Sequence, residues 1–450
     1  MSKALLNGYQ SALRGAYEAA VDAVCVQDLR FAAEKGDCAE VRVMRNALQY
    51  ALGASIEGHR AMAVAYDFGT DELASVAHVG VNASLVILAV DNEIRPYCDL
   101  RAISFATHLP MMEPASVYEC KTFVKIACNM SEKYDVPVIV HIGQGLIDTY
   151  EDVELVEPKV LAAKPYKRNV EKYVTLPTGN KLCAEDIVVR DKRLTTDCDA
   201  FPVHQVEYRD RAMGVICYGE AFASLMVAAP HLSTLRLGMT YPLPLATVRE
   251  FASGVEDLVV MEEGEPIVEY ALKAQGISCH GEDLFPLRMR YNPSEIKERL
   301  LGVEVPKDDV SLPIRTPAFC GECPLIELFT AIKKAEVKTH TDVDCAYLAA
   351  NIPMICVDTA FAASPVALAA GFAKHTPCVC VLRADRVDLN DFLAPLPNLS
   401  VFIYGDVRQL SDVLAVLQPV VQVIDVKQSA EYLTKAGVWL VKMSAECRHG

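Results

Sequence analysis

The stretch Leu85-Val86-Ile87-Leu88-Ala89-Val90-Asp91-Asn92 joins six apolar residues to an abrupt polar end. An uninterrupted apolar run of this length is typical of a strand buried on both faces, as in a parallel sheet. A second such run, 136–141, follows an amphipathic helical pattern over 116–134. Because strand and helix patterns alternate, the sequence predicts a parallel sheet flanked by helices, an α/β fold.

Further segments show the same two periodicities. We expect helices over 4–22 and 40–52, and a crossing connection over the charged, turn-rich stretch 151–205. Beyond residue 206 the alternation resumes. Strands are expected at 213–219, 235–238, 257–261, 377–382, 399–404 and 420–425, and helices at 219–230 and 266–275. A polar, proline-bounded linker over 305–317 precedes the last piece of the chain.

Length and composition bound the class of protein. The 450 residues have room for about three domains of about 150 residues each. A content of 52% hydrophobic and 23% charged residues suits folded domains, and no run approaches the roughly 20 apolar residues that span a bilayer. The net charge of −16 argues against binding to nucleic acid or an anionic membrane. Since the first residues lack a signal-peptide pattern, we expect a cytoplasmic protein.

Sixteen cysteines are many for a cytoplasmic chain, and most stand alone among apolar residues, where a thiol packs as a small hydrophobic group. The exception is the C-x-x-C pair Cys320 and Cys323, with Cys345 further along. A tight turn can aim two sulfurs at one metal ion, and a third cysteine could complete three corners of an iron–sulfur cube. Candidates for a fourth ligand are Cys356, Cys378, Cys380 and Cys447. A structural zinc site and plain buried thiols are the alternatives.

Other polar residues lie beside predicted strands. Glu262, Glu263 and Glu265 precede a helix start, where carboxylates favour the positive end of the helix dipole, so we expect a structural role. His141 and Asp91 end two strands, at the position where α/β sheets bind ligands. A structural role is the more frequent one for a lone residue there. Neither of the phosphate-binding motifs G-x-G-x-x-G and G-x-x-x-x-G-K-[ST] occurs.

Several stretches follow one another in the order of a known family. They cover 5–19, 53–55, 110–116, 127–139, 236–244, 248–252, 259–266, 315–324 and 344–348. Residues 315–324 read R-T-P-A-F-C-G-E-C-P, and 344–348 read D-C-A-Y-L. In content and order the chain resembles the alpha subunit of indolepyruvate ferredoxin oxidoreductase, a family of thiamine-diphosphate-dependent 2-oxoacid oxidoreductases.

The resemblance implies a three-domain architecture like that of thiamine-diphosphate enzymes. The domains would be a pyrimidine-type domain over 1–205, with the crossing segment from about 151, a transketolase C-terminal-like domain over 206–305, and a degenerate diphosphate-type domain over 306–450. It also implies that Asp344, Tyr347 and Asp385 contact the cofactor.

Departures from the family pattern concern the cofactor. The glutamate that activates the thiamine aminopyrimidine falls at about Met44, which cannot relay a proton. The magnesium loop is replaced by residues 382–386, L-R-A-D-R, and one aspartate between two arginines is a poor set of oxygen ligands. This argues against thiamine diphosphate and magnesium, although arginines can contact phosphates directly. The C-x-x-C-x-x-C-x-x-x-C-P run of the family's ferredoxin module does not occur.

Three functional hypotheses follow. The chain is the catalytic subunit that decarboxylates an aryl pyruvate on thiamine diphosphate and passes electrons to a cluster. Alternatively, it is a non-catalytic scaffold (a pseudoenzyme) or an iron–sulfur electron-relay subunit, or its pocket holds another anionic ligand. The sequence identifies no catalytic residue. The resemblance implies a homodimer or a hetero-oligomer with a small oxidoreductase subunit, and a separate electron carrier such as ferredoxin.

Overall fold

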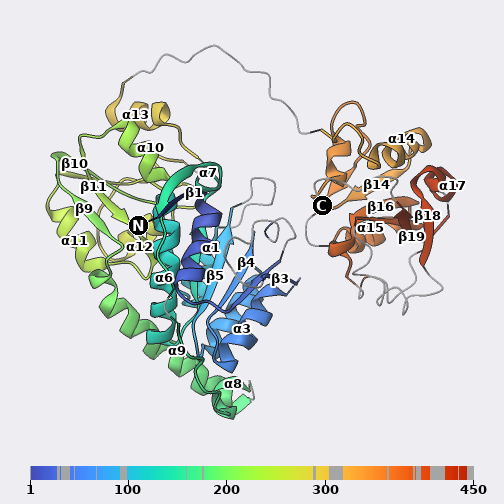
Figure 1. Ribbon diagram of the computed structural model, residues 1–450. Coiled ribbons are helices and arrows are strands. Elements are labelled where there is room, and N and C mark those ends of the chain that lie inside the picture. Colours follow the sequence, from blue (N-terminus) through green and yellow to red (C-terminus); the bar gives the residue numbers. More distant parts are fainter. Residues whose placement is uncertain are drawn as a thin grey trace. The chain divides into compact units, whose positions relative to one another are not determined.

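The residues described by the computed structural model form two compact units (Figure 1). Unit 1 comprises the described residues between 2 and 303, and unit 2 those between 318 and 442. The described residues are 2–27, 31, 41–44, 46–66, 68–91, 99–158, 160–174, 177–286, 290–303, 318–361, 364–388, 391, 397–405, 421–433 and 435–442. No helix within these ranges is both long and apolar enough to cross a membrane.

Unit 1 contains a seven-stranded, mainly parallel sheet flanked by helices (Figure 1). Its strands in spatial order are β12 (Met239–Tyr241), β6 (Met111–Met112), β7 (Val138–Ile142), β5 (Leu85–Val90), β4 (Ala61–Ala65), β2 (Ala23–Val26) and β3 (Val41–Val43). The flanking helices are α1 (Gly8–Glu18), α3 (Ala47–Glu57), α4 (Thr70–Val79), α5 (Leu100–Thr107), α6 (Val117–Tyr134) and α7 (Gln144–Asp148). Helix α6 packs on β5 and β7, and α3 packs on β2 and β4. The predicted α/β class is confirmed.

The apolar run 85–90 forms β5, the central strand of this sheet. Each of its six residues is at most 2% exposed, and β4 and β7 pair with it in parallel on its two sides. A strand without any polar residue is stable only where both of its faces are covered. The predicted buried parallel strand is therefore confirmed, as are the strand at 136–141 (β7) and the helix at 116–134 (α6).

The first predicted helix, 4–22, is wrong at its start. Residues Lys3–Asn7 form strand β1, which pairs antiparallel with β8 (Tyr150–Glu154), and α1 begins only at Gly8. The side chain of Asn7 accepts the Gln10 backbone N–H at 2.8 Å, and the Gln10 side chain accepts the Asn7 backbone N–H at 3.1 Å. This reciprocal cap sets the start of the helix. The apolar residues at helical spacing before Gly8 therefore do not extend α1.

Two other segments differ from the prediction. The helix expected over 40–52 is preceded by β3, whose valines pair with those of β2, so that α3 begins at Ala47. The expected crossing connection 151–205 contains β8 and helices α8 (Val170–Tyr173) and α9 (Pro177–Asp197). Helix α9 lies against α4 and α6, and its many charged residues had obscured the helical pattern.

A second, four-stranded sheet completes unit 1. Its spatial order is β13 (Asp257–Val260), β10 (Asp210–Tyr218), β11 (Leu232–Leu237) and β9 (Gln205–Glu207), with only β9 antiparallel. Its helices are α10 (Ala221–Ala228), α11 (Leu245–Ser253), α12 (Ile267–Ala274) and α13 (Pro293–Leu301). The strands and helices predicted between 213 and 275 are confirmed. Residues 1–205 and 206–303 share unit 1, and their division into two domains stays a prediction.

Unit 2 contains a six-stranded parallel sheet. Its order is β15 (Thr359–Ala360), β14 (Lys338–Thr341), β16 (Cys378–Arg383), β17 (Leu399–Tyr404), β19 (Gly437–Lys442) and β18 (Val421–Asp425). Its helices are α14 (Leu325–Ala335), α15 (Pro365–Ala373) and α17 (Ser429–Tyr432). From β14 the chain passes to the edge strand β15 and then returns to β16 on the other side of β14. The topological switch point, where such sheets bind ligands, therefore lies between β14 and β16.

We predict that Leu88→Ala destabilises unit 1 by about 2–5 kcal/mol, because it opens a cavity in a fully buried strand. The matched variant Leu5→Ala, at a residue that is 63% exposed, should change stability by no more than about 0.5 kcal/mol. The measurement is urea unfolding followed by far-UV circular dichroism. Trp439, the single tryptophan, lies in unit 2, so its fluorescence transition should shift less. Equal effects of the two variants would contradict the assignment of β5 to the core.

Candidate functional site

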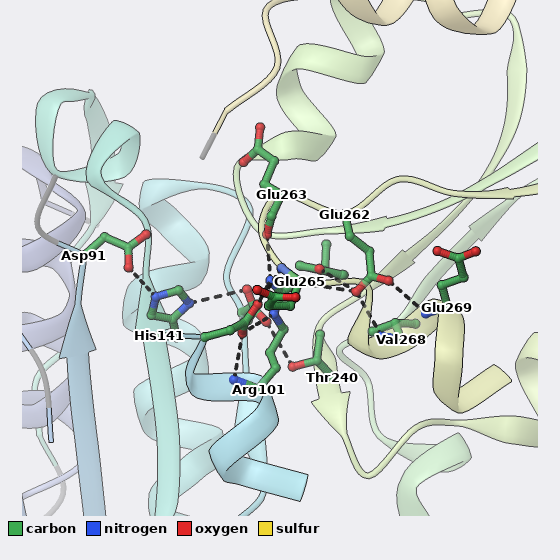
Figure 2. A network of polar contacts seen from close by, with 12 residues as sticks. Asp91, Arg101, His141, Thr240, Glu262, Glu263, Glu265, Val268 and Glu269 are labelled. Carbon is green, nitrogen blue, oxygen red and sulfur yellow. Dashed lines mark hydrogen bonds and ion pairs between the residues drawn. The ribbon is translucent and has the colours of Figure 1, made fainter. Parts of the chain in front are cut away.

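Three neighbouring strands of the large sheet bring Asp91, Glu113 and His141 together, and we refer to these residues as the His141 network. Figure 2 shows Asp91 beside His141. Strand β7 lies between β5 and β6 and is parallel to both, so the carboxyl ends of all three strands share one edge. His141 Nε2 lies 2.7 Å from Asp91 Oδ1, and Nδ1 lies 3.4 Å from Glu113 Oε2. Glu113 also accepts the Thr240 hydroxyl at 3.0 Å.

The surroundings of the His141 ring favour its positively charged form. Burial alone would lower the pKa of His141, but the neighbouring charges of Asp91 and Glu113 outweigh it and raise the pKa well above its usual value. Burial alone would raise the pKa of the Asp91 carboxyl, but the charge of His141 outweighs burial and lowers it. When the ring is protonated, each of its nitrogens has a carboxylate partner.

Arg101 of α5 joins the large sheet to the four-stranded one (Figure 2). Its Nε donates to Asp99 Oδ1 at 2.8 Å, and its Nη2 donates to the Glu263 carbonyl at 2.6 Å. Its Nη1 lies 3.5 Å from Glu262 Oε1. All three charged side chains are buried, and burying a charge is tolerable only while its partners remain. No sequence pattern pointed to Arg101.

Of the three glutamates after β13, Glu262 has the predicted structural role at a helix start. Glu262 accepts the N–H groups of Val268 at 2.9 Å and Glu269 at 2.8 Å, in the first turn of α12. Burial raises the pKa of Glu262 to about 7, against the opposing charge of Arg101. Glu263 instead accepts the Tyr291 N–H at 3.0 Å, and burial raises its pKa to about 7 as well. The helix-start prediction is thus confirmed for Glu262 and wrong for Glu263.

A further carboxylate, Glu220, lies against the loop that leaves β7. Its Oε1 accepts Arg290 Nε at 2.9 Å, and burial raises its pKa. A Cβ atom added at Gly145, in the first turn of α7, would stand 2.3 Å from Glu220 Oε2, so a side chain there would require the carboxylate to shift. Sequence reasoning missed Glu220 and Arg290. The glycines Gly143 and Gly145 directly after a strand were the available signal.

At the switch point of unit 2 four charged residues form what we call the switch-point ion set: Asp342, Asp344, Arg383 and Arg386. Asp344 lies 3.0 Å from Arg386 Nε and 3.6 Å from Arg383 Nη1. Asp342 accepts the backbone N–H groups of Arg383 at 2.6 Å and of Asp344 at 3.1 Å. It also accepts the Tyr404 hydroxyl at 3.4 Å. Burial raises the pKa of Asp342 to about 7.

These residues do not fit a magnesium ion. Magnesium needs close to octahedral coordination by oxygen, usually with one or two carboxylates facing it. Here the oxygens of both described carboxylates are directed at hydrogen-bond donors of the chain, and two guanidinium groups lie beside Asp344. Within the described ranges, no group of three or more His, Cys, Asp or Glu side chains is gathered to hold a metal ion.

The predicted cofactor residues are placed as follows. Asp344 follows β14, and Tyr347, half-buried, lies in the short 3-10 helix Ala346–Ala350. Asp385 follows β16 in the 3-10 helix Ala384–Arg386, but its side chain lies outside the described part of the structure. That these three residues contact a cofactor stays a prediction.

The predicted cluster cysteines lie on one side of the unit 2 sheet. Cys323 is buried in the core that covers this face, and Cys320, Cys345 and Cys356 pack against the same core. Cys378 and Cys380 alternate along β16 with residues of that core, so they point to the opposite face. They are therefore poorly placed as fourth ligands. Cys447 lies outside the described residues.

Comparison with known proteins confirms the family resemblance. No protein-family model matches the chain. The chain is 29% identical over 359 residues to indolepyruvate oxidoreductase subunit IorA of Pyrococcus horikoshii, covering 70% of this chain and 55% of that protein. It is 26% identical to the IorA subunit of Archaeoglobus fulgidus over 408 residues, 79% of this chain and 66% of the relative. The chain thus spans 55% of the length of the first relative and 66% of the length of the second.

A solved structure supports the fold. The 2-oxoglutarate:ferredoxin oxidoreductase from Magnetococcus marinus matches with a TM-score of 0.52 at 14% sequence identity. The match covers 66% of this chain and 64% of that one. At this identity the likeness concerns the fold alone, and it agrees with the predicted thiamine-diphosphate-enzyme-like architecture.

We predict that His141 stays protonated through neutral pH. Its folded-state pKa lies above the unfolded value of about 6.5, so its protonation stabilises the fold fully below that pH, and the stabilisation is lost as pH rises through the folded-state pKa. The measurement is ¹⁵N NMR of histidine-labelled protein. His204, whose pKa burial lowers to about 4, provides the internal contrast of a neutral ring. Asp91→Asn should lower the His141 midpoint, and a midpoint unchanged by this substitution would contradict the charge assignment.

Proposed function

We propose that this chain is a subunit of a 2-oxoacid oxidoreductase complex of the indolepyruvate type, and that unit 2 relays electrons through an iron–sulfur cluster. The observation that carries the proposal is the position of Cys320, Cys323 and Cys345, which come from two chain segments and meet at one core. The similarity to IorA subunits supports the oxidoreductase assignment. We propose that the complex works in the cytoplasm with a separate electron carrier such as ferredoxin.

The donor chemistry of these residues fits an iron–sulfur cluster. Cysteine thiolates are its usual ligands, and a cluster bound here would supply one-electron transfer. The Cys323 N–H donates to the Cys320 carbonyl at 2.9 Å, which closes the tight turn between the two thiols. Since the described side chains are not gathered into a metal site, loading would require them to turn toward one another. Among the fourth-ligand candidates, Cys356 packs against the same core.

The second candidate function is complete catalysis, the oxidation of an aryl pyruvate on thiamine diphosphate. Sequence identity to IorA subunits favours it, whereas the switch-point ion set does not fit the magnesium that would hold the diphosphate. We therefore assign no step of that reaction to residues of this chain. A chain that alone reduces a viologen dye with an aryl pyruvate, in the presence of thiamine diphosphate and magnesium, would establish this candidate over a relay or scaffold role.

The partners follow from the same resemblance. We propose a hetero-oligomer with a small oxidoreductase subunit or a homodimer, because the relatives are named as subunits. Size-exclusion chromatography with light scattering on the purified chain distinguishes a homodimer from a monomer that awaits its partner.

We predict that anaerobic reconstitution with iron and sulfide gives the full chain a brown colour with about four iron and four sulfide per chain. Cys320→Ser and Cys323→Ser should each abolish most of the absorbance near 400 nm while leaving the circular dichroism spectrum unchanged. The matched control is Cys378→Ser, a buried cysteine of the same unit on the opposite face of the sheet, which should keep its colour.

The outcome that contradicts the relay proposal is a colourless chain after reconstitution, or one whose colour survives both substitutions. Zinc bound in place of iron, with the same dependence on Cys320 and Cys323, would identify a structural metal site instead. Absence of any metal would leave these cysteines as core side chains.

A further inference from the structure

The switch point between β14 and β16 is the place where sheets of this kind bind ligands, because the strand order reverses there. The resemblance to the indolepyruvate oxidoreductase family implies a magnesium loop at residues 382–386, at the end of β16. In this chain Asp342 and Asp344 follow β14, and the guanidinium groups of Arg383 and Arg386 approach them from β16 and the turn after it. The acids and the cations thus come from the two strands that flank the switch point.

We infer that Arg383 and Arg386 take the place of the divalent cation at this switch point, so that the chain neutralises its own carboxylates and needs no metal there. Asp344 is 5% exposed and lies between the two arginine side chains, which are 10% and 19% exposed. A carboxylate so deeply buried needs a cation, and here each of its oxygens has one from the chain. This inference goes beyond the proposed electron relay and does not depend on a cluster.

The backbone around Arg383 is shaped to hold its side chain. Strand β17 is followed by Gly405, whose φ of 97° is open mainly to glycine. A Cβ atom at this position would stand 3.1 Å from Arg383 Cγ, so the missing side chain leaves room for the arginine stem. The Arg383 N–H also donates to Asp342 at 2.6 Å. The backbone N–H of Arg383 therefore bonds to Asp342, while its guanidinium group pairs with Asp344.

A magnesium ion could enter only by displacing these groups. Its position beside Asp344 would place a double positive charge next to two guanidinium groups that stay protonated at every physiological pH. Asp342 has its two oxygens turned to the N–H groups of Arg383 and Asp344, which removes it as a ready ligand. The arrangement accordingly excludes a divalent cation while both arginines are present.

The test measures Mn²⁺ binding to the full chain by electron paramagnetic resonance, and thiamine diphosphate binding by calorimetry with either magnesium or EDTA. Wild-type protein should bind no Mn²⁺ tightly, and magnesium should not promote thiamine diphosphate binding. R383Q/R386Q should gain about one Mn²⁺ per chain, because it removes both guanidinium groups from the buried carboxylate of Asp344. The gain should disappear when Asp344→Asn is added. The matched control R211Q/R249Q removes two exposed arginines of unit 1 and should gain nothing.

Tight Mn²⁺ binding or magnesium-dependent thiamine diphosphate binding by the wild-type chain would overturn the inference. So would an R383Q/R386Q protein that gains no Mn²⁺, or a gain that survives Asp344→Asn. If the double variant fails to fold, R386Q alone should show a smaller gain, and no gain would again overturn the inference. Because the readouts are Mn²⁺ resonance and heats of binding, failure here is distinct from failure of cluster reconstitution.

Discussion

A strand buried on both faces accommodates few charged side chains, and at both candidate sites of this protein carboxylates stand directly after such strands. In unit 1, β5 is apolar throughout, and its first polar successor is Asp91. In unit 2 the first charged residue after β14 is Asp342. A carboxylate placed there is partly or wholly withdrawn from water and must find a cation or hydrogen-bond donors nearby. The positions of His141, Arg101, Arg383 and Arg386 all meet that requirement.

The two units supply the cations for these carboxylates from different side chains. In unit 1 an imidazolium is held between two carboxylates, and its charge depends on a proton. In unit 2 the cations are guanidinium groups, which keep their charge at any pH that the folded chain withstands. The cation beside the carboxylates of unit 1 can therefore lose its charge as pH rises, whereas the two guanidinium groups of unit 2 keep theirs.

The sequence predicted what depends on local pattern. The uniform apolar run of β5 and the amphipathic run of α6 have no competing interpretation, and both were found at the predicted residues. The start of α1 was missed because Lys3–Asn7 pairs with a strand more than 140 residues away, which no local periodicity encodes. At the candidate sites, Asp344 was predicted from the resemblance, but its arginine partners became visible only once β14 and β16 were placed side by side. Glu220 and Arg290 likewise meet only through the fold.

The pairing of β1 with β8 has a consequence for synthesis. Lys3 pairs with Glu154, Arg14 donates to the Val156 carbonyl at 2.8 Å, and the buried carboxylate of Glu18 accepts the Val156 N–H at 2.9 Å. Strand β1 thus has no partner until residues 150–154 have been synthesised, and until Val156 follows, Arg14 and Glu18 lack the backbone partners that they have in the folded unit. Until then β1 has an unpaired strand edge, which is the kind of edge on which strands of other chains can add.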